Sequence, residues 1–291
     1  MNPVQELLAL KKRPFGTTGI VVSEVGFGTA GLGALFGRHS QAEQLLTLHR
    51  ALDLGMNFYD TSDMYCQGES ERLIAAAFHR RRDQVVIATK VGYQLPPQRR
   101  LASTVKPLIR PLVRRLGLKR EQLPPGVRGS LSQNFSPQYI LRAVEQSLKR
   151  LNTDYIDVYQ LHSPPRLVLE RADFLEPLDQ LKRQGKIRCF GISCETTDDA
   201  LICLRYPELS ALQLRLNLLD QSALQQVIPA AAKRGLAIIA RECFAGGHLF
   251  HAADSVPPQL ALRFVLDVNE VSVAILGMSS EAHLMANLGC M

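Results

Sequence analysis

The sequence predicts a (β/α)8 barrel of the α/β class, formed as a single domain over residues 1–291. Short β-branched runs alternate with amphipathic helical segments, and the alternation closes at eight units, which is typical of parallel βαβ repeats. A barrel of this kind commonly takes about 250 residues plus insertions. The composition, 46% hydrophobic and 21% charged, is that of a globular protein able to bury a large core. A six-stranded doubly wound sheet is the rival, and it requires two units to be misassigned.

The predicted elements follow one another in strict alternation. Strands are expected at residues 25–28, 57–60, 84–90, 156–161, 187–193, 211–216, 236–241 and 272–276. The helices that follow them are expected at residues 41–54, 69–80, 137–150, 174–183, 198–205, 223–233, 259–266 and 281–288. Ser136 is the candidate N-cap of the third helix, with Pro137 at its first position. Gly185 and Gly235 end the fourth and sixth helices.

Two segments lie outside the repeat. Residues 13–22 read as a β-hairpin around a glycine-containing turn, which would close the bottom of the barrel. Residues 92–135 form an insertion after the third strand, far longer than the usual connection of about 2 to 6 residues. Its central part carries nine basic residues and one acidic residue, so the rest of the chain is nearly neutral. A lid that recruits an anionic substrate is one interpretation of this insertion, and a solvated loop is the other.

Several function classes are disfavoured by composition. No apolar run approaches the roughly 18 residues needed to span a membrane, and the apolar patch near the amino terminus precedes its basic residues, which reverses a secretory signal. We therefore expect a cytoplasmic protein. The six cysteines show neither a CxxC pair nor zinc-ligand spacing, so no disulfide framework and no metal site are predicted. Prolines and the scarcity of aromatic residues in the insertion disfavour nucleic-acid or membrane contact.

Four unlike polar residues stand at the carboxyl ends of predicted strands or just beyond them: Asp60, Tyr65, Lys90 and His162. The carboxyl ends of barrel strands meet on one face, so these side chains are expected to converge there. A lysine that closes a buried β-branched run is costly to desolvate unless a carboxylate meets it, and Asp60 is the obvious partner. The pattern predicts an active site.

The chemistry of these four residues suits protonation of a carbonyl oxygen while hydride arrives at carbon. A phenol is a weak acid at neutral pH, and the nearby ammonium of Lys90 would strengthen Tyr65 in that role. Asp60 would keep Lys90 ionised, and His162 would hydrogen-bond the same substrate oxygen. The set lacks a nucleophile, which disfavours acyl transfer. The structural alternative is an ion pair inside the barrel, with Tyr65 packing a loop.

Ordered stretches along nearly the whole chain match a known family. They are residues 13–19, 55–62 followed by Tyr65 and 68–71, 88–92, 150–157, 161–164, 185–188 and 191–193. Through these stretches the chain resembles the aldo-keto reductases, bacterial-style members in particular. The resemblance implies a (β/α)8 barrel that binds NADP(H) in an extended form without a Rossmann domain, and a catalytic tetrad of Asp60, Tyr65, Lys90 and His162.

The implied activity is NADPH-dependent hydride transfer to an aldehyde, a ketone or a related carbonyl, with Tyr65 as general acid. The expected partner is therefore a small carbonyl substrate. Two alternatives stay open. One is an NAD(P)-dependent dehydrogenase of sugars or alcohols, and the other is a nucleotide-binding barrel of low activity with a regulatory role.

The resemblance also implies a cofactor site, with departures from the family pattern at two positions. Ser193 and Gln213 match the residues that bind the nicotinamide carboxamide. Cys194 stands where an asparagine is usual, and Leu216 stands where an aromatic residue is expected to stack on the ring. Both departures imply a weaker hold on nicotinamide.

For the rest of the cofactor, the implied contacts lie after the first, seventh and eighth strands. They are Gly28, Thr29, Phe244, Ala245, Gly246 and Gly247 for the pyrophosphate, Gly277, Met278, Ser279, Ser280 and His283 for the ribose phosphate, and Asn287 for adenine. NADP(H) is expected from the family. NAD(H) is the alternative, because the lysine and arginine usual near the ribose phosphate are missing here.

Overall fold

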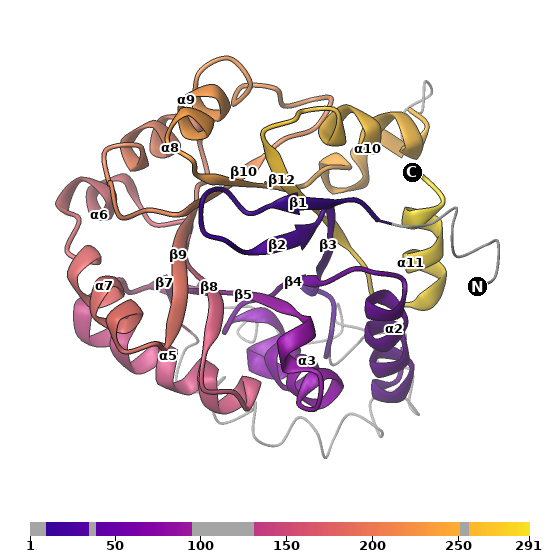
Figure 1. Cartoon of the computed structure of the whole chain (residues 1–291), viewed down its shortest axis with the longest axis horizontal. Coiled ribbons are helices and arrows are strands. Elements are labelled where there is room, and N and C mark those ends of the chain that lie inside the picture. Colours follow the sequence, from indigo (N-terminus) through magenta and orange to yellow (C-terminus); the bar gives the residue numbers. More distant parts are fainter. Residues whose placement is uncertain (1–9, 35–38, 95–130, 251–255) are drawn as a thin grey trace.

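The computed structural model describes residues 10–34, 39–94, 131–250 and 256–291, and its centre is a closed barrel of eight parallel strands. The strands pair in the order β3, β4, β5, β8, β9, β10, β11 and β12, and β12 returns to β3 (Figure 1). Their bounds are Val25–Gly28, Phe58–Asp60, Val86–Val91, Ile156–His162, Ile187–Ser193, Ala211–Arg215, Ala237–Arg241 and Val271–Gly277. The predicted barrel is confirmed, and the doubly wound sheet is excluded because the sheet has no open edge.

Helices surround the barrel. They are α2 (Gln41–Asp53), α3 (Glu69–Phe78), α5 (Pro137–Leu151), α6 (Arg166–Arg171), α7 (Leu175–Arg183), α8 (Thr197–Cys203), α9 (Val227–Lys233), α10 (Pro258–Leu266) and α11 (Glu281–Leu288), with short 3-10 turns η1 (Tyr65–Gly68), η2 (Arg82–Gln84) and η5 (Ala245–Phe250). The sequence predicted a helix in each of the eight units but not the extra α6. Ser136 is the N-cap of α5 and Pro137 is its first residue, as predicted, although the Ser136 side chain makes no capping hydrogen bond.

The amino-terminal hairpin closes one end of the barrel, as predicted. Its strands are β1 (Lys12–Pro14) and β2 (Val21–Ser23), which pair antiparallel. Phe15 from the hairpin is fully buried in one hydrophobic cluster with inward-facing strand residues such as Phe58, and the two ring centroids lie 5.7 Å apart. The interior at this end is therefore filled by side chains.

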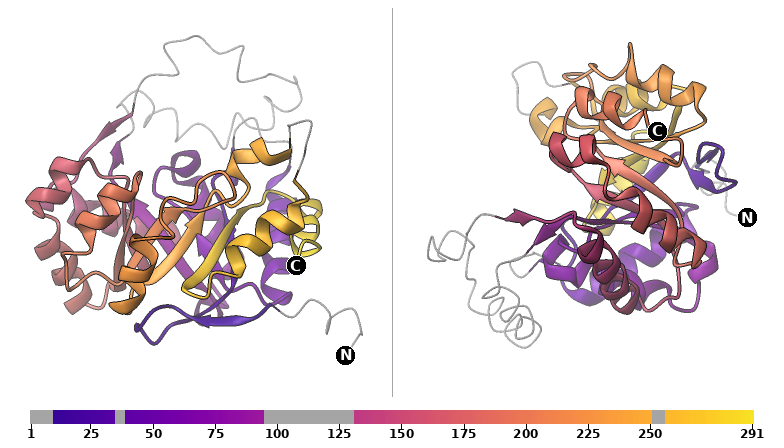
Figure 2. Two further views of the ribbon diagram at one scale, coloured as in Figure 1. Left: turned by 90° about the horizontal axis from the view of Figure 1, so that it is seen from above. Right: turned by 90° about the vertical axis from the view of Figure 1, so that its left-hand side faces the viewer.

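The insertion leaves the barrel at the opposite end. Its first and last described residues form a short antiparallel ladder between β6 (Tyr93–Gln94) and β7 (Ser132–Gln133). Figure 2 shows the β1–β2 hairpin and this ladder at opposite ends of the barrel. Residues 95–130, on which the predicted lid and its basic run depend, lie outside the described residues. Within the described ranges, no helix is long and apolar enough to cross a membrane.

Candidate active site

The tetrad residues converge because they occupy adjoining strands. Asp60 ends β4, Lys90 lies near the end of β5, and His162 ends β8. Since β4 pairs with β5 and β5 with β8, their carboxyl ends lie side by side. Tyr65 follows five residues after Asp60, at the start of η1.

Lys90 and Asp60 form an ion pair that is almost completely shielded from solvent. Lys90 Nζ lies 2.6 Å from Asp60 Oδ2, and the two side chains are 1% and 6% exposed. The other carboxylate oxygen accepts hydrogen bonds from the side-chain amides of Gln213 at 2.9 Å and Gln160 at 3.5 Å. Burial opposes the charged form of Lys90, but Asp60 and Tyr65 outweigh it and raise the pKa of Lys90. The ammonium group is therefore charged at neutral pH.

Tyr65 is held beside this ammonium. Lys90 Nζ donates to the phenol oxygen of Tyr65 at 3.4 Å and lies 4.9 Å from the ring centroid. The backbone after Tyr65 makes a tight turn, with Cys66 at φ 50° and Gln67 at φ 66°, both left-handed. This turn carries the chain from the barrel rim into α3 and leaves the phenol on the cavity wall.

His162 faces the same cavity as a neutral imidazole. Burial, together with the charges of Lys90 and Arg241, lowers the pKa of His162 to about 3. Its Nδ1 lies 3.3 Å from Ser62 Oγ, and its ring meets those of Tyr65 and Tyr93 edge-on. A neutral imidazole can donate or accept a hydrogen bond at a substrate oxygen without adding charge.

A cavity of about 700 Å³ joins the tetrad to most of the predicted cofactor contacts. Among the predicted residues, its lining includes Asp60, Tyr65, His162, Gly28, Thr29, Ser193, Gln213, Phe244, Gly246, Gly247, Gly277, Met278, Ser279 and His283. Lys90 stands behind this wall and reaches the cavity through Tyr65. The cavity thus runs from the tetrad past the ends of β3, β11 and β12.

The groups present fit a nicotinamide dinucleotide. The amide nitrogen of Gln213 is engaged by Asp60, so its oxygen remains to accept from a carboxamide, while the Ser193 hydroxyl can donate. Gly246 and Gly247 have φ of 64° and 94°, and together with Gly28 they bring bare backbone to the cavity wall. A Cβ on Gly28 would meet the Ile275 side chain at 2.9 Å. Such bare backbone allows close approach of a pyrophosphate.

Five predicted cofactor contacts lie outside the cavity lining: Cys194, Leu216, Ala245, Ser280 and Asn287. Cys194 and Leu216 are 2% and 0% exposed and belong to the hydrophobic core. Cys194 Sγ lies 3.7 Å from Cys203 Sγ of α8, and Leu216 follows the last residue of β10. Ser280 instead caps α11, with its hydroxyl accepting from the backbone of His283. In this arrangement the Leu216 side chain does not face the cavity.

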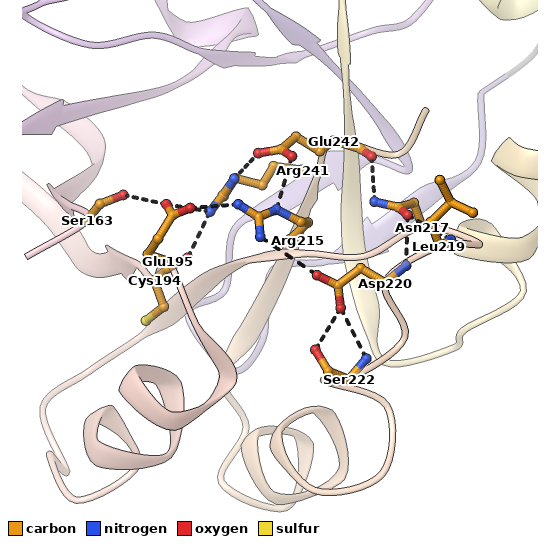
Figure 3. Close-up of polar contacts among 10 residues, drawn as sticks. All are labelled: Ser163, Cys194, Glu195, Arg215, Asn217, Leu219, Asp220, Ser222, Arg241 and Glu242. Carbon is orange, nitrogen blue, oxygen red and sulfur yellow. Dashed lines mark hydrogen bonds and ion pairs between the residues drawn. The ribbon is translucent and has the colours of Figure 1, made fainter. Parts of the chain in front are cut away.

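Sequence reasoning missed a charged cluster at the ends of β9, β10 and β11, drawn in Figure 3. Arg241 donates to Glu195 at 3.1 Å and to the Cys194 carbonyl at 3.0 Å, and Arg215 contacts Glu195 at 2.6 Å and Glu242 at 3.0 Å. Glu195, Arg241 and Glu242 line the cavity. The rule that located the tetrad, polar residues at strand ends, would have found them too. Exposed pairs of this kind contribute at most about 1 kcal/mol each, so the cluster shapes the field at the cavity more than it stabilises the fold.

Comparison with known proteins points to one family. A model described as the aldo/keto reductase family matches residues 24–258. A D-threo-aldose 1-dehydrogenase of Pseudomonas sp is 30% identical over 239 residues, which cover 79% of this chain and 68% of that protein. An NADH-specific methylglyoxal reductase of Escherichia coli (strain K12) is 31% identical over 238 residues, covering 79% and 66%. The chain thus spans about two thirds of the length of these relatives.

Solved structures agree with the sequence matches. The holo form of an aldo-keto reductase from Bacillus halodurans superposes with a TM-score of 0.78 at 26% identity, covering 97% of this chain and 90% of that one.

Proposed function

The chain belongs to the aldo/keto reductase family of NAD(P)H-dependent oxidoreductases, and within it we propose a reductase that transfers hydride from NADPH to an aldehyde, a ketone or a related carbonyl. One observation carries the proposal. Lys90 Nζ contacts both the Asp60 carboxylate and the Tyr65 hydroxyl, and these two partners line a cavity of about 700 Å³. An ammonium held by a carboxylate can stabilise the negative charge that develops on the phenol oxygen as the phenol gives up its proton.

A nicotinamide cofactor, when bound, would supply the hydride. Tyr65 donates its proton to the carbonyl oxygen as negative charge develops there, and Lys90 stabilises the phenolate that remains. Asp60 keeps Lys90 charged and fixed in position. His162, whose ring meets that of Tyr65 edge-on, hydrogen-bonds the same oxygen and orients it. The reverse reaction uses the same groups, with Tyr65 as base.

For the cofactor, we propose NADP(H). Ser279, His283 and the amino end of α11 supply hydrogen-bond donors for a ribose phosphate at the far end of the cavity from the tetrad. NAD(H) is the alternative, because this end of the lining offers neither lysine nor arginine, and the E. coli relative is named for NADH.

A dehydrogenase acting on sugars or alcohols is the second candidate, favoured by the name of the Pseudomonas relative. A regulatory barrel without turnover is disfavoured by the complete tetrad. The preference for an anionic substrate depends on the basic insertion, so we keep it as a prediction, to be tested by comparing charged and uncharged aldehydes of equal size.

The test is a titration of the protein with NADPH, NADP+, NADH and NAD+, followed by the fluorescence of tyrosine or of the bound nicotinamide, since the chain has no tryptophan. We expect saturable binding that is tighter for NADPH and NADP+ than for NADH and NAD+. We also expect the reduced cofactor to be oxidised when a carbonyl compound is added. Binding of none of the four would contradict the proposal and favour the regulatory barrel.

A further inference from the structure

Behind His162 lies a short hydrogen-bonded chain that the proposed mechanism does not use. Ser62 is fully buried, and its Oγ lies 3.3 Å from His162 Nδ1 and 3.2 Å from Asp63 Oδ1. The same oxygen accepts the backbone N–H of Met64 at 3.2 Å and lies 3.4 Å from the Lys90 carbonyl oxygen. One hydroxyl thus connects a carboxyl group to the imidazole on the cavity wall.

The single proton of Ser62 makes the two ends of this chain interdependent. If the hydroxyl donates to an ionised Asp63, it can only accept from His162, and Nδ1 must then carry the imidazole proton. If Asp63 is protonated and donates to Ser62, the hydroxyl is released to donate to Nδ1, which at 3.3 Å is nearer than its other acceptor, the Lys90 carbonyl oxygen at 3.4 Å, and the imidazole proton then sits on Nε2. Nε2 is the ring nitrogen left for the cavity, because Nδ1 is turned to Ser62.

Asp63 can change its charge near neutral pH because of what surrounds it. Burial and the nearby carboxylate of Glu71 raise the pKa of Asp63 to about 8, against the opposing effects of Arg150, Ser62 and Met64. Glu71 of α3 is itself buried and paired with Arg150 of α5 at 2.5 Å. From β8, the buried hydroxyl of Tyr159 also lies in the field of Asp63. Asp63 lines a second cavity, of about 660 Å³, through which protons can exchange.

His162, in contrast, stays neutral over the same range. The cations that face it are Lys90 from β5 and Arg241 from β11, and both oppose its protonation, as does burial. Tyr65 and Tyr93 contact its ring edge-on. The variable at this residue is therefore which nitrogen bears the proton, and not whether the ring is charged.

We propose that Ser62 and Asp63 are positioning residues that set the tautomer of His162, with protonated Asp63 placing a proton on Nε2 and ionised Asp63 leaving Nε2 bare. The switch releases one proton to solvent. Hydrogen moves from Asp63 to Ser62, from Ser62 to Nδ1, and from Nε2 to water, so that the imidazole remains neutral and the carboxylate gains the negative charge.

The catalytic consequence rests on the proposed function. An Nε2–H group donates to a carbonyl oxygen and therefore suits reduction, whereas a bare Nε2 accepts from an alcohol hydroxyl and suits oxidation. Carbonyl reduction should thus decline, about tenfold for each pH unit, as the pH rises above about 8. Alcohol oxidation should rise over the same range.

The direct test is 15N NMR of protein labelled at histidine, without substrate, titrated from about pH 6 to pH 10. A His162→Gln variant assigns the signals of His162 among the seven histidines. We expect the wild type to pass from the Nε2–H pattern to the Nδ1–H pattern near pH 8. Asp63→Asn should show one pattern throughout. Asp198→Asn, which removes an exposed carboxylate on α8, should retain the transition.

Ser62→Ala separates the hydrogen-bonded chain from a simple field effect. It leaves Asp63 able to titrate but removes the connecting hydroxyl, so the transition of His162 should disappear. A transition that persists in Ser62→Ala, or a wild type with one tautomer throughout, would overturn the inference. Because this readout needs neither cofactor nor turnover, a protein with no carbonyl reductase activity would refute the proposed function alone.

Discussion

Lys90 is both a buried, paired charge and a direct neighbour of the proposed acid, Tyr65. It is among the largest fully buried side chains, and every donor on its ammonium group serves the site: Asp60, the Thr61 carbonyl and Tyr65. A buried charge is tolerated only when it is paired and hydrogen-bonded. The contacts that stabilise the buried charge of Lys90 therefore also hold its ammonium group next to the phenol of Tyr65.

Because Lys90 and Asp60 are paired, removing one of them should strongly reduce the free energy of unfolding. Lys90→Met should lower the free energy of unfolding by about 3 to 5 kcal/mol, because Asp60 would be left buried without its countercharge. Urea unfolding followed by circular dichroism measures the change. Asp60→Asn combined with Lys90→Met should be more stable than Lys90→Met alone, since no uncompensated charge remains. A loss below about 1 kcal/mol in the single variant would show that the pair is not isolated from water.

Single residues were easiest to predict from the sequence where a polar side chain interrupts or ends an apolar strand. A lysine in a β-branched strand and a histidine at a strand end are visible without coordinates, and all four tetrad residues meet as expected. The side of the strand to which Leu216 points could not be predicted. It follows the end of β10 by one residue, where the alternation of the strand no longer fixes direction, and its side chain enters the core.

Among the elements, the amino-terminal hairpin packs on the end of the barrel away from the ladder of β6 and β7. Phe15, which follows β1, is completely buried against Phe58. This contact helps to fill the end of the barrel with side chains.

Phe15→Ala should therefore destabilise the fold by about 3 to 5 kcal/mol, through lost apolar burial and the void that remains. Its affinity for the nicotinamide cofactor should stay within about twofold of the wild type at temperatures where both are folded. Val21→Ala is the matched control on the same hairpin, because Val21 is 54% exposed and its truncation should change stability by less than about 0.5 kcal/mol. If Phe15→Ala lowered cofactor affinity but left the free energy of unfolding unchanged, the proposed structural role of Phe15 would be contradicted.

Element positions were predictable to the extent that periodicity marked them. The order of strands and helices follows from the alternation, whereas α6 escaped notice because Arg166–Arg171 is less than two turns long. Ser136 is the N-cap of α5, as predicted; its backbone N–H donates to Asn134 Oδ1 at 2.9 Å, and its side chain makes no capping hydrogen bond. By contrast, Ser40 and Glu43 form a complete capping box on α2.

On the scale of the whole molecule, the two ends of the barrel differ in what they carry. One end is filled by the hairpin, and the other carries the tetrad, the cofactor cavity, the charged cluster of Figure 3 and the base of the insertion. This division lets loops at the carboxyl ends of the strands vary in sequence without loss of the core. The charged wall of Glu195, Arg241 and Glu242 lies at the same end, where the rule of polar residues at strand ends would also have located it.

The measurement that bears most directly on carbonyl reduction by this molecule is the turnover number of Tyr65→Phe with NADPH and a reactive aldehyde, beside its affinity for NADPH. Tyr59→Phe is the matched control, since it removes a phenol hydroxyl that points away from the cavity and donates to the Met56 carbonyl. We expect Tyr65→Phe to lose about 10² to 10⁴ in turnover with cofactor affinity unchanged, and Tyr59→Phe to retain activity. Unchanged turnover in Tyr65→Phe would contradict its role as the acid.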